Sequence, residues 1–215
     1  MTSGGDSRDV ANSTAVAAVA LSLSELLNRW YTELAAADPD AFRAKPTARI
    51  VSTDDYRQIG ATVNSRIRFP SLAIFCYRAD INRTMRAPWS AVAHVDGKIH
   101  LPLDLHFLLT PFDSDAEAEL RILGATMQCL ERHPILAGPR LHPIADWDTR
   151  DAIQVVNEDL VTEDVLRTFD TLPTDFRLSV AYLARVTRID APDEPDNPDV
   201  LTAVRGLVPS PVPVP

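Results

Sequence analysis

The sequence predicts an α+β fold, in which a mixed and mainly antiparallel sheet packs against two main helices. Two long helical patterns are separated by strand patterns with short turns, an order that favours α+β over a doubly wound nucleotide-binding sheet. The chain has 215 residues, 46% of them hydrophobic and only 7 of them glycine, so it can bury a substantial core. We expect one domain over residues 13–190, with a flexible N-terminus over 1–12 and a proline-rich arm over 191–215.

The first expected helix is amphipathic. Asn12 or Ser13 is a candidate cap, and Asp38-Pro39 ends the helix. Charged and polar residues interrupt its apolar run, which argues against a signal peptide. The chain contains no run of about 18 apolar residues, the length that a membrane-spanning helix needs. The apolar face comprises Val16, Val19, Leu23, Leu26 or Leu27, Trp30 and Leu34.

Two strands are expected before residue 80. Residues 48–52 suit a short strand, and residues 56–70 suit an irregular segment. Residues 72–77 are almost wholly apolar, which is typical of a central strand covered on both faces. We expect an exposed turn over residues 83–88 and a hairpin turn at Asp96-Gly97 that leads into the next strand.

The most regular strand pattern covers residues 99–109. Leucine and phenylalanine alternate along residues 101–109 and should share one face of the strand, because successive side chains point to opposite faces. His100, Asp104 and His106 should therefore lie together on the other face. A turn is expected at residues 110–113.

A second long helix is expected directly after that turn. Ser114 and Glu117 have the spacing of a capping box, in which each side chain satisfies a backbone donor at the helix start. His133-Pro134 ends the helix. Its expected apolar stripe consists of Leu120, Leu123, Met127 and Leu130.

The last third of the domain alternates between loops and regular elements. Residues 134–147 are expected to form a loop or an edge strand, and residues 153–156 a strand. Thr162 is a candidate cap of a short helix that Leu172-Pro173 ends. A long final strand should place Leu178, Val180, Tyr182, Ala184 and Val186 on one face.

Charge and cysteine content limit the function classes. The net charge is −9, which disfavours sequence-independent binding to nucleic acid phosphates. Cys76 and Cys129 both fall in apolar patterns, so we expect two small buried side chains rather than a disulfide. These features favour cytoplasmic synthesis.

The only grouping that suggests catalysis is His100, Asp104 and His106. Asp104 and His106 could act as a base with its orienting carboxylate, or as metal ligands, although zinc sites need three or four ligands in defined geometry. HExxH, paired CxxC, G-x-S-x-G and phosphate-binding glycine patterns are all absent from the sequence, so we expect no cofactor. We favour a structural role in which Asp104 and His106 pair with each other; a small metal-dependent hydrolase is the alternative.

Several segments together resemble the cap or tail-terminator family of contractile injection systems, which are phage-tail-like particles. The resemblance extends over about residues 16–190 and includes no catalytic signature. It implies a tail-terminator-like fold and a non-enzymatic protein that forms a homohexameric ring and closes the distal end of a tube. It also implies contacts with the inner tube protein and the sheath protein. The segments are SLAIFCYR at 71–78 with NR at 82–83, LDLHFLLT at 103–110, LxxHPIL at 130–136 and FRLSVAY at 176–182.

The sequence also offers candidate contact residues for such a ring. Arg185 and Arg188, near the end of the last strand, could meet acidic groups of a partner. The tail over residues 208–215 favours extended, polyproline-like conformations, which suit an arm laid across a neighbouring subunit. A frayed end is the alternative reading of this tail, and a generic binding module is a further alternative for the whole protein. The remaining candidate interface residues are Asp104, His106, Val208, Val212 and Val214.

Overall fold

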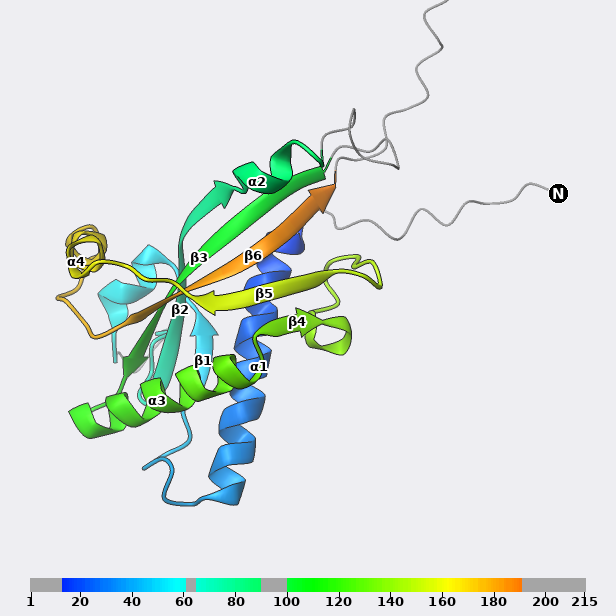
Figure 1. Ribbon diagram of the computed structural model, residues 1–215. Coiled ribbons are helices and arrows are strands. Elements are labelled where there is room, and N and C mark those ends of the chain that lie inside the picture. Colours follow the sequence, from blue (N-terminus) through cyan, green and yellow to red (C-terminus); the bar gives the residue numbers. More distant parts are fainter. Residues whose placement is uncertain (1–12, 61–64, 90–99, 191–215) are drawn as a thin grey trace, which may run out of the picture.

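The computed structural model describes residues 13–60, 65–89 and 100–190 and contains one six-stranded sheet (Figure 1). The strand order is β1-β2-β3-β6-β5-β4; β1 and β2 are parallel, and the other neighbours are antiparallel. The predicted α+β class with a mixed, mainly antiparallel sheet is confirmed. The strands are β1 (Thr47–Ile50), β2 (Ser71–Ile81), β3 (His100–Phe112), β4 (Ile135–Ala137), β5 (Ala152–Asn157) and β6 (Val180–Asp190).

Helices cover both faces of this sheet. The two long helices, α1 (Ala15–Ala37) and α3 (Ala116–Arg132), pack on one face. The short helix α4 (Thr162–Asp170) and the 3₁₀ helix η1 (Thr53–Gln58) pack on the other. None of the helices in the described part of the chain is long and apolar enough to cross a membrane. The remaining helical turns are α2 (Arg83–Arg86) and η2 (Gly138–Arg140).

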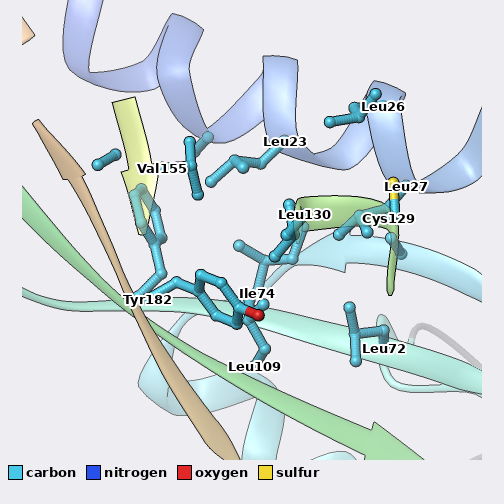
Figure 2. Packing of buried hydrophobic residues seen from close by; sticks show 14 of the residues in the cluster. Leu23, Leu26, Leu27, Leu72, Ile74, Leu109, Cys129, Leu130, Val155 and Tyr182 are labelled. Carbon is cyan, nitrogen blue, oxygen red and sulfur yellow. The ribbon is translucent and has the colours of Figure 1, made fainter. Parts of the chain in front are cut away.

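The larger core lies between the sheet and the two long helices (Figure 2). Leu23 and Leu27 of α1 are almost fully buried in it, together with Leu130 of α3. The hydroxyls of Tyr31 and Thr126 form a 2.5 Å hydrogen bond between α1 and α3, which satisfies two polar groups in this core. The two long helices thus pack on the same apolar face of the sheet, as the sequence predicts.

A second core covers the other face at one end of the sheet. Tyr56 of η1 and Phe169 of α4 pack there on Ala73, Leu108 and other strand residues. Strand residues at this end are therefore buried on both faces, which explains their nearly continuous apolar character. The other end of the same face carries polar side chains, described below.

The prediction that residues 72–77 are covered throughout is wrong in its second half. Leu72 and Ile74 are buried, whereas Cys76, further along β2, is exposed. Cys129 is buried as predicted, and the two cysteines are free.

Both neighbours of β3 contain one extra residue. In β2, Tyr77 has no register partner between the pairs Cys76–Phe107 and Arg78–His106. In β6, residues 185 and 186 lie opposite the single residue Asp104. An unpaired residue reverses the side-chain alternation beyond it. The prediction that Val186 shares a face with Tyr182 and Ala184 is therefore wrong: Val186 is only half-buried, whereas the next residue, Thr187, is fully buried.

The start of α3 also differs from the sequence prediction. Residues 110–112 continue β3, because they pair with Ser71–Ala73, so the expected turn is displaced and α3 begins at Ala116. No capping box forms: Ser114 bonds to Asp113, and Glu117 pairs with Arg121 at 2.8 Å.

The buried stripe of α3 is only partly the predicted one. Leu123 and Leu130 are buried, but Leu120 is 56% exposed and Met127 is 38% exposed. The buried side of α3 is displaced from the predicted stripe and includes several small residues. The other buried residues of α3 are Ala118, Ile122, Ala125, Thr126 and Cys129.

The remaining helix ends agree with the predictions to within one or two residues. The N-cap of α1 is Thr14, whose hydroxyl donates to the Ile144 carbonyl; Ser13 does not cap the helix, and Asn12 lies outside the described residues. Thr162 is the first residue of α4 rather than its cap. The turn at residues 83–88 contains helix α2, and the loop after α3 includes the edge strand β4. The Asp96-Gly97 turn lies outside the described residues.

Candidate functional site: a polar network on the β3 surface

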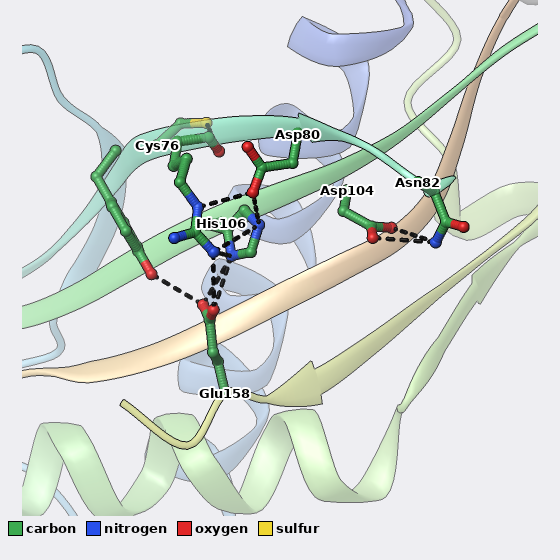
Figure 3. A network of polar contacts seen from close by, with 8 residues as sticks. Cys76, Asp80, Asn82, Asp104, His106 and Glu158 are labelled. Carbon is green, nitrogen blue, oxygen red and sulfur yellow. Dashed lines mark hydrogen bonds and ion pairs between the residues drawn. The ribbon is translucent and has the colours of Figure 1, made fainter. Parts of the chain in front are cut away.

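The extra residues in β2 and β6 determine which side chains surround β3 on its polar face. Beyond Tyr77, the pairing places Arg78 opposite His106 and Asp80 opposite Asp104. These four side chains lie on the face of the sheet opposite α1 and α3, next to the second core (Figure 3). The loop after β5 adds Glu158 to the group.

His106 is at the centre of this network. Its Nδ1 lies 2.8 Å from Glu158 Oε1, and its Nε2 lies 3.4 Å from Asp80 Oδ2 (Figure 3). Arg78 Nε approaches the same Asp80 oxygen at 3.0 Å. The His106 side chain is only 6% exposed and that of Glu158 only 14%, so the contact between them is shielded from solvent.

Tyr77 extends the network through its hydroxyl, which donates to Glu158 Oε2 at 2.9 Å. Burial of the phenol, followed by its hydrogen bond to the Glu158 carboxylate and the charge of that group, raises the pKa of Tyr77 above its usual value. The contacts of Glu158 thus connect the β5–α4 loop to β2 and β3. This arrangement fixes the position of that loop.

Asp104 belongs to a separate pair. The Asn82 side-chain amide donates to both Asp104 carboxylate oxygens, at 3.1 and 3.0 Å (Figure 3). The Asn82 amide oxygen accepts the backbone N–H of Met85 and so caps α2. The predicted pairing of Asp104 with His106 is therefore wrong, because each residue has its own partner.

His100 lies at the far end of the strand, in a third group. Its Nδ1 bonds to the buried carboxylate of Asp190 in β6. Arg188 Nε lies 3.1 Å from the same carboxylate, and Arg188 also approaches Asp151 at 3.7 Å. The Trp89 ring meets His100 edge-on. This group joins β3, β5 and β6 at one end of the sheet.

These contacts do not assemble the hydrolase site considered from the sequence. His100, Asp104 and His106 share a strand face, but each is engaged with a different group. In residues 13–60, 65–89 and 100–190, no cluster of three or more His, Cys, Asp or Glu side chains is arranged to hold a metal ion. The hydrogen bonds and ion pairs of the network link strands and loops, which is a structural role.

The other candidate residues have varied surroundings. Arg185 is exposed, and its Nε donates to Gln154 on the neighbouring strand at 3.2 Å. Arg188 is engaged internally, with 20% of its side chain exposed. Val208, Val212 and Val214 lie outside the described residues. Sequence reasoning missed Glu158, which is 52 positions from His106 and has no local pattern that connects the two residues.

Comparisons with known proteins bear on the resemblance noted from the sequence. A family model described as "Pvc16 N-terminal domain" matches residues 18–203. The fold is similar to a solved structure, "Cryo-EM Structure of an Extracellular Contractile Injection System, PVC sheath/tube terminator in extended state", with a TM-score of 0.51 and 13% sequence identity. That similarity covers 91% of this chain and 65% of the other, so this chain spans about two thirds of that protein's length. No curated protein matches the sequence.

The family match and the fold similarity agree with each other and with the predicted resemblance to a tail terminator, which is confirmed. The matched range includes every strand described above and every helix except the first three residues of α1. It also includes the polar network on β3. Because the family model covers most of the sequence, the chain belongs to the Pvc16 N-terminal domain family.

Proposed function

We propose that this protein is a structural component of a contractile injection system that caps the distal end of the tube, ends tube polymerisation and anchors the sheath. The family match over residues 18–203 carries the proposal. The similar solved structure, a PVC sheath/tube terminator, supports the same role. The function needs no cofactor and no catalytic step.

The proposed mechanism is steric. The protein forms a ring of identical subunits, a hexamer by family resemblance, whose one face matches the end of the inner tube. A heterologous assembly stops when the exposed face of its last layer offers no complementary surface to a further subunit. The ring therefore ends tube growth and leaves a defined particle length.

An open sheet edge supports attachment of a sheath protein. β1 pairs only with residues 71–74 of β2, so residues 75–81 of β2 have no outer strand in the described part of the chain. An extended segment of another chain can add to such an edge through main-chain hydrogen bonds. We assign sheath anchoring to this edge of β2.

The domain organisation is part of the proposal. Residues 13–190 form the capping domain, residues 1–12 a flexible leader and residues 191–215 an arm over the neighbouring subunit. In the ring, Val208, Val212 and Val214 contact that neighbour, and Arg185 meets an acidic group of a partner. The hydrogen bonds of Asp104 and His106 maintain the shape of the contact surface around β3. Deleting residues 208–215 should weaken ring assembly, and unchanged assembly would exclude the arm.

The decisive measurement is the length distribution of particles, by electron microscopy, from cells with and without the gene. We expect overlong, uncapped or sheathless tubes without it and normal particles when the gene is restored. Intact particles of normal length in the deletion strain would refute the capping role.

A further inference from the structure

A basic cleft lies where the C-terminal end of α3 meets α1. This cleft has a volume of about 320 Å³. Its lining includes Arg29 and Trp30 of α1, Arg132 and His133 at the end of α3, and Arg140 of η2. We call these five residues the basic cleft. Three separate elements contribute to it, so the fold brings together positive charges that are distant in the sequence.

The arginines of the basic cleft are available to a partner. In the described part of the chain, Arg29 and Arg140 form no ion pair or hydrogen bond, and Arg132 only stacks on the Trp30 ring, 5.7 Å from its centroid. Glu33 is the one carboxylate that lines the cleft among the described residues. The α3 C-terminus contributes about half a negative charge, too little to neutralise three guanidinium groups. A protein with a net charge of −9 thus concentrates positive charge here.

Two further observations show that the basic cleft is positive and incompletely satisfied. The pKa of His133 is lowered by burial and then by Arg140 and Arg132, whereas Glu33 acts in the opposite direction. The indole N–H of Trp30 is shielded from solvent and has no acceptor among the residues that the structure describes. A carboxylate of a partner can accept two parallel hydrogen bonds from one guanidinium group of this cleft.

The opposite side of the molecule carries a complementary surface. The α4 segment, residues 159–178, packs against the sheet face that α1 and α3 do not cover. It is rich in exposed acidic side chains, and Asp164 and Asp170 have no ion pair in the described part of the chain. Exposed apolar side chains lie among the acids. The acidic residues are Asp159, Glu163, Asp164, Asp170 and Asp175, and the exposed apolar ones are Val161, Leu166, Phe176 and Leu178.

We propose that the basic cleft of one copy binds the α4 segment of a second copy. Carboxylates of the α4 segment meet the arginines of the cleft, and its apolar side chains lie against Trp30 and against Ile135, which is exposed and follows His133 by two residues. The two surfaces lie on opposite layers of the molecule, so the contact is head-to-tail and can repeat until a ring closes. This inference rests on the proposed ring and identifies the surfaces that join its subunits.

A charge exchange tests this contact in the full-length protein. The first variant combines Arg132→Glu with Arg140→Glu, and the second combines Asp164→Arg with Asp170→Arg. Each variant alone should place like charges at the contact and weaken self-association by more than about tenfold. In an equimolar mixture, each altered surface meets its opposite, so alternating assembly should return. Sedimentation velocity measures all three samples beside the wild type.

The control is Arg83→Glu, an equivalent charge reversal on α2, which should assemble like the wild type. Thermal unfolding checks the fold of every variant, and Arg29→Glu with Arg140→Glu replaces the first variant if that one is unfolded. The contact is refuted if the wild type sediments as a monomer at every concentration. It is also refuted if either charge-reversal variant assembles normally by itself, or if mixing the two variants does not restore assembly. If the variants form normal rings that do not cap tubes, the contact between copies is also refuted, and the cleft instead binds another protein of the particle. Particle length in the deletion strain tests the proposed function independently of all these results.

Discussion

Asn28 on α1 hydrogen-bonds both backbone groups of Ala48 in the edge strand β1. Its side-chain oxygen accepts the Ala48 N–H at 2.9 Å, and its side-chain nitrogen donates to the Ala48 carbonyl at 3.0 Å. The Ser24 hydroxyl donates to the same carbonyl. One amide side chain thus occupies the position of a neighbouring strand and closes this edge at Ala48 to further pairing.

Replacing Asn28 by alanine should destabilise the protein by about 2 kcal/mol. Ala48 is buried, so its N–H would lose its partner without gaining water, and unsatisfied buried polar groups are costly. Urea unfolding measures the change in the free energy of unfolding. Ser24→Ala is the matched control and should cost less, since Asn28 still satisfies the Ala48 carbonyl. Equal losses in the two variants would contradict this role of Asn28.

Glu158→Gln should lower the pKa of Tyr77. The substitution removes a negative charge that opposes ionisation of the phenol, but burial, the larger cause, keeps the pKa above that of a free tyrosine. Ultraviolet titration, with Tyr77→Phe used to identify the signal, measures the shift. Tyr56, whose pKa is raised to about 12 chiefly by burial, serves as an internal control and should not move. An unchanged pKa of Tyr77 would mean that Glu158 does not contact this residue in solution.

Stability should fall as the pH rises above about 10. All four tyrosines of the chain have a raised pKa in the fold, with burial as the first cause for each. The unfolded chain releases these phenolic protons near pH 10 and the folded chain retains them, so higher pH favours unfolding. Denaturant titrations between pH 8 and 12 should show this loss, and Tyr31→Phe should make it shallower. Stability independent of pH over this range would refute the prediction.

Charge changes around the basic cleft should shift the pKa of His133 in opposite directions. Arg140→Gln removes a positive neighbour and should raise this pKa, whereas Glu33→Gln removes a negative neighbour and should lower it. NMR titration of the imidazole measures both shifts, with Arg83→Gln as the distant control. Shifts of the same sign in the first two variants would show that these charges do not act on His133.

Much of the fold could be predicted because it depends on local patterns. The apolar periodicity of residues 16–34, the end at Asp38 and the alternation along β3 all correspond to elements of the structure. The predicted stripe of α3 was partly wrong for a physical reason. Periodicity marks apolar positions, but the packing of α3 on the sheet also buries small and polar residues such as Ala125 and Thr126 and leaves Leu120 exposed.

The candidate site was predictable only in part, since its partners come from distant segments. Alternation correctly placed His100, Asp104 and His106 on one strand face. Their actual partners are Asp190, Asn82 and Glu158, and these pairings depend on strand order and on extra residues in β2 and β6. Tertiary pairing determines those features, and no local sequence signal reports them.

The extra residues in β2 and β6 divide the sheet into two regions with different tolerance to substitution. At one end, strand residues are enclosed by two cores, so a change in side-chain volume disturbs packing on both faces. Beyond the extra residues, one face carries side chains held by charge and hydrogen bonds, which can be replaced by other polar pairs while the strands remain in place. Surface specificity can therefore diverge at this end without altering the architecture, which is consistent with a shared fold at 13% identity.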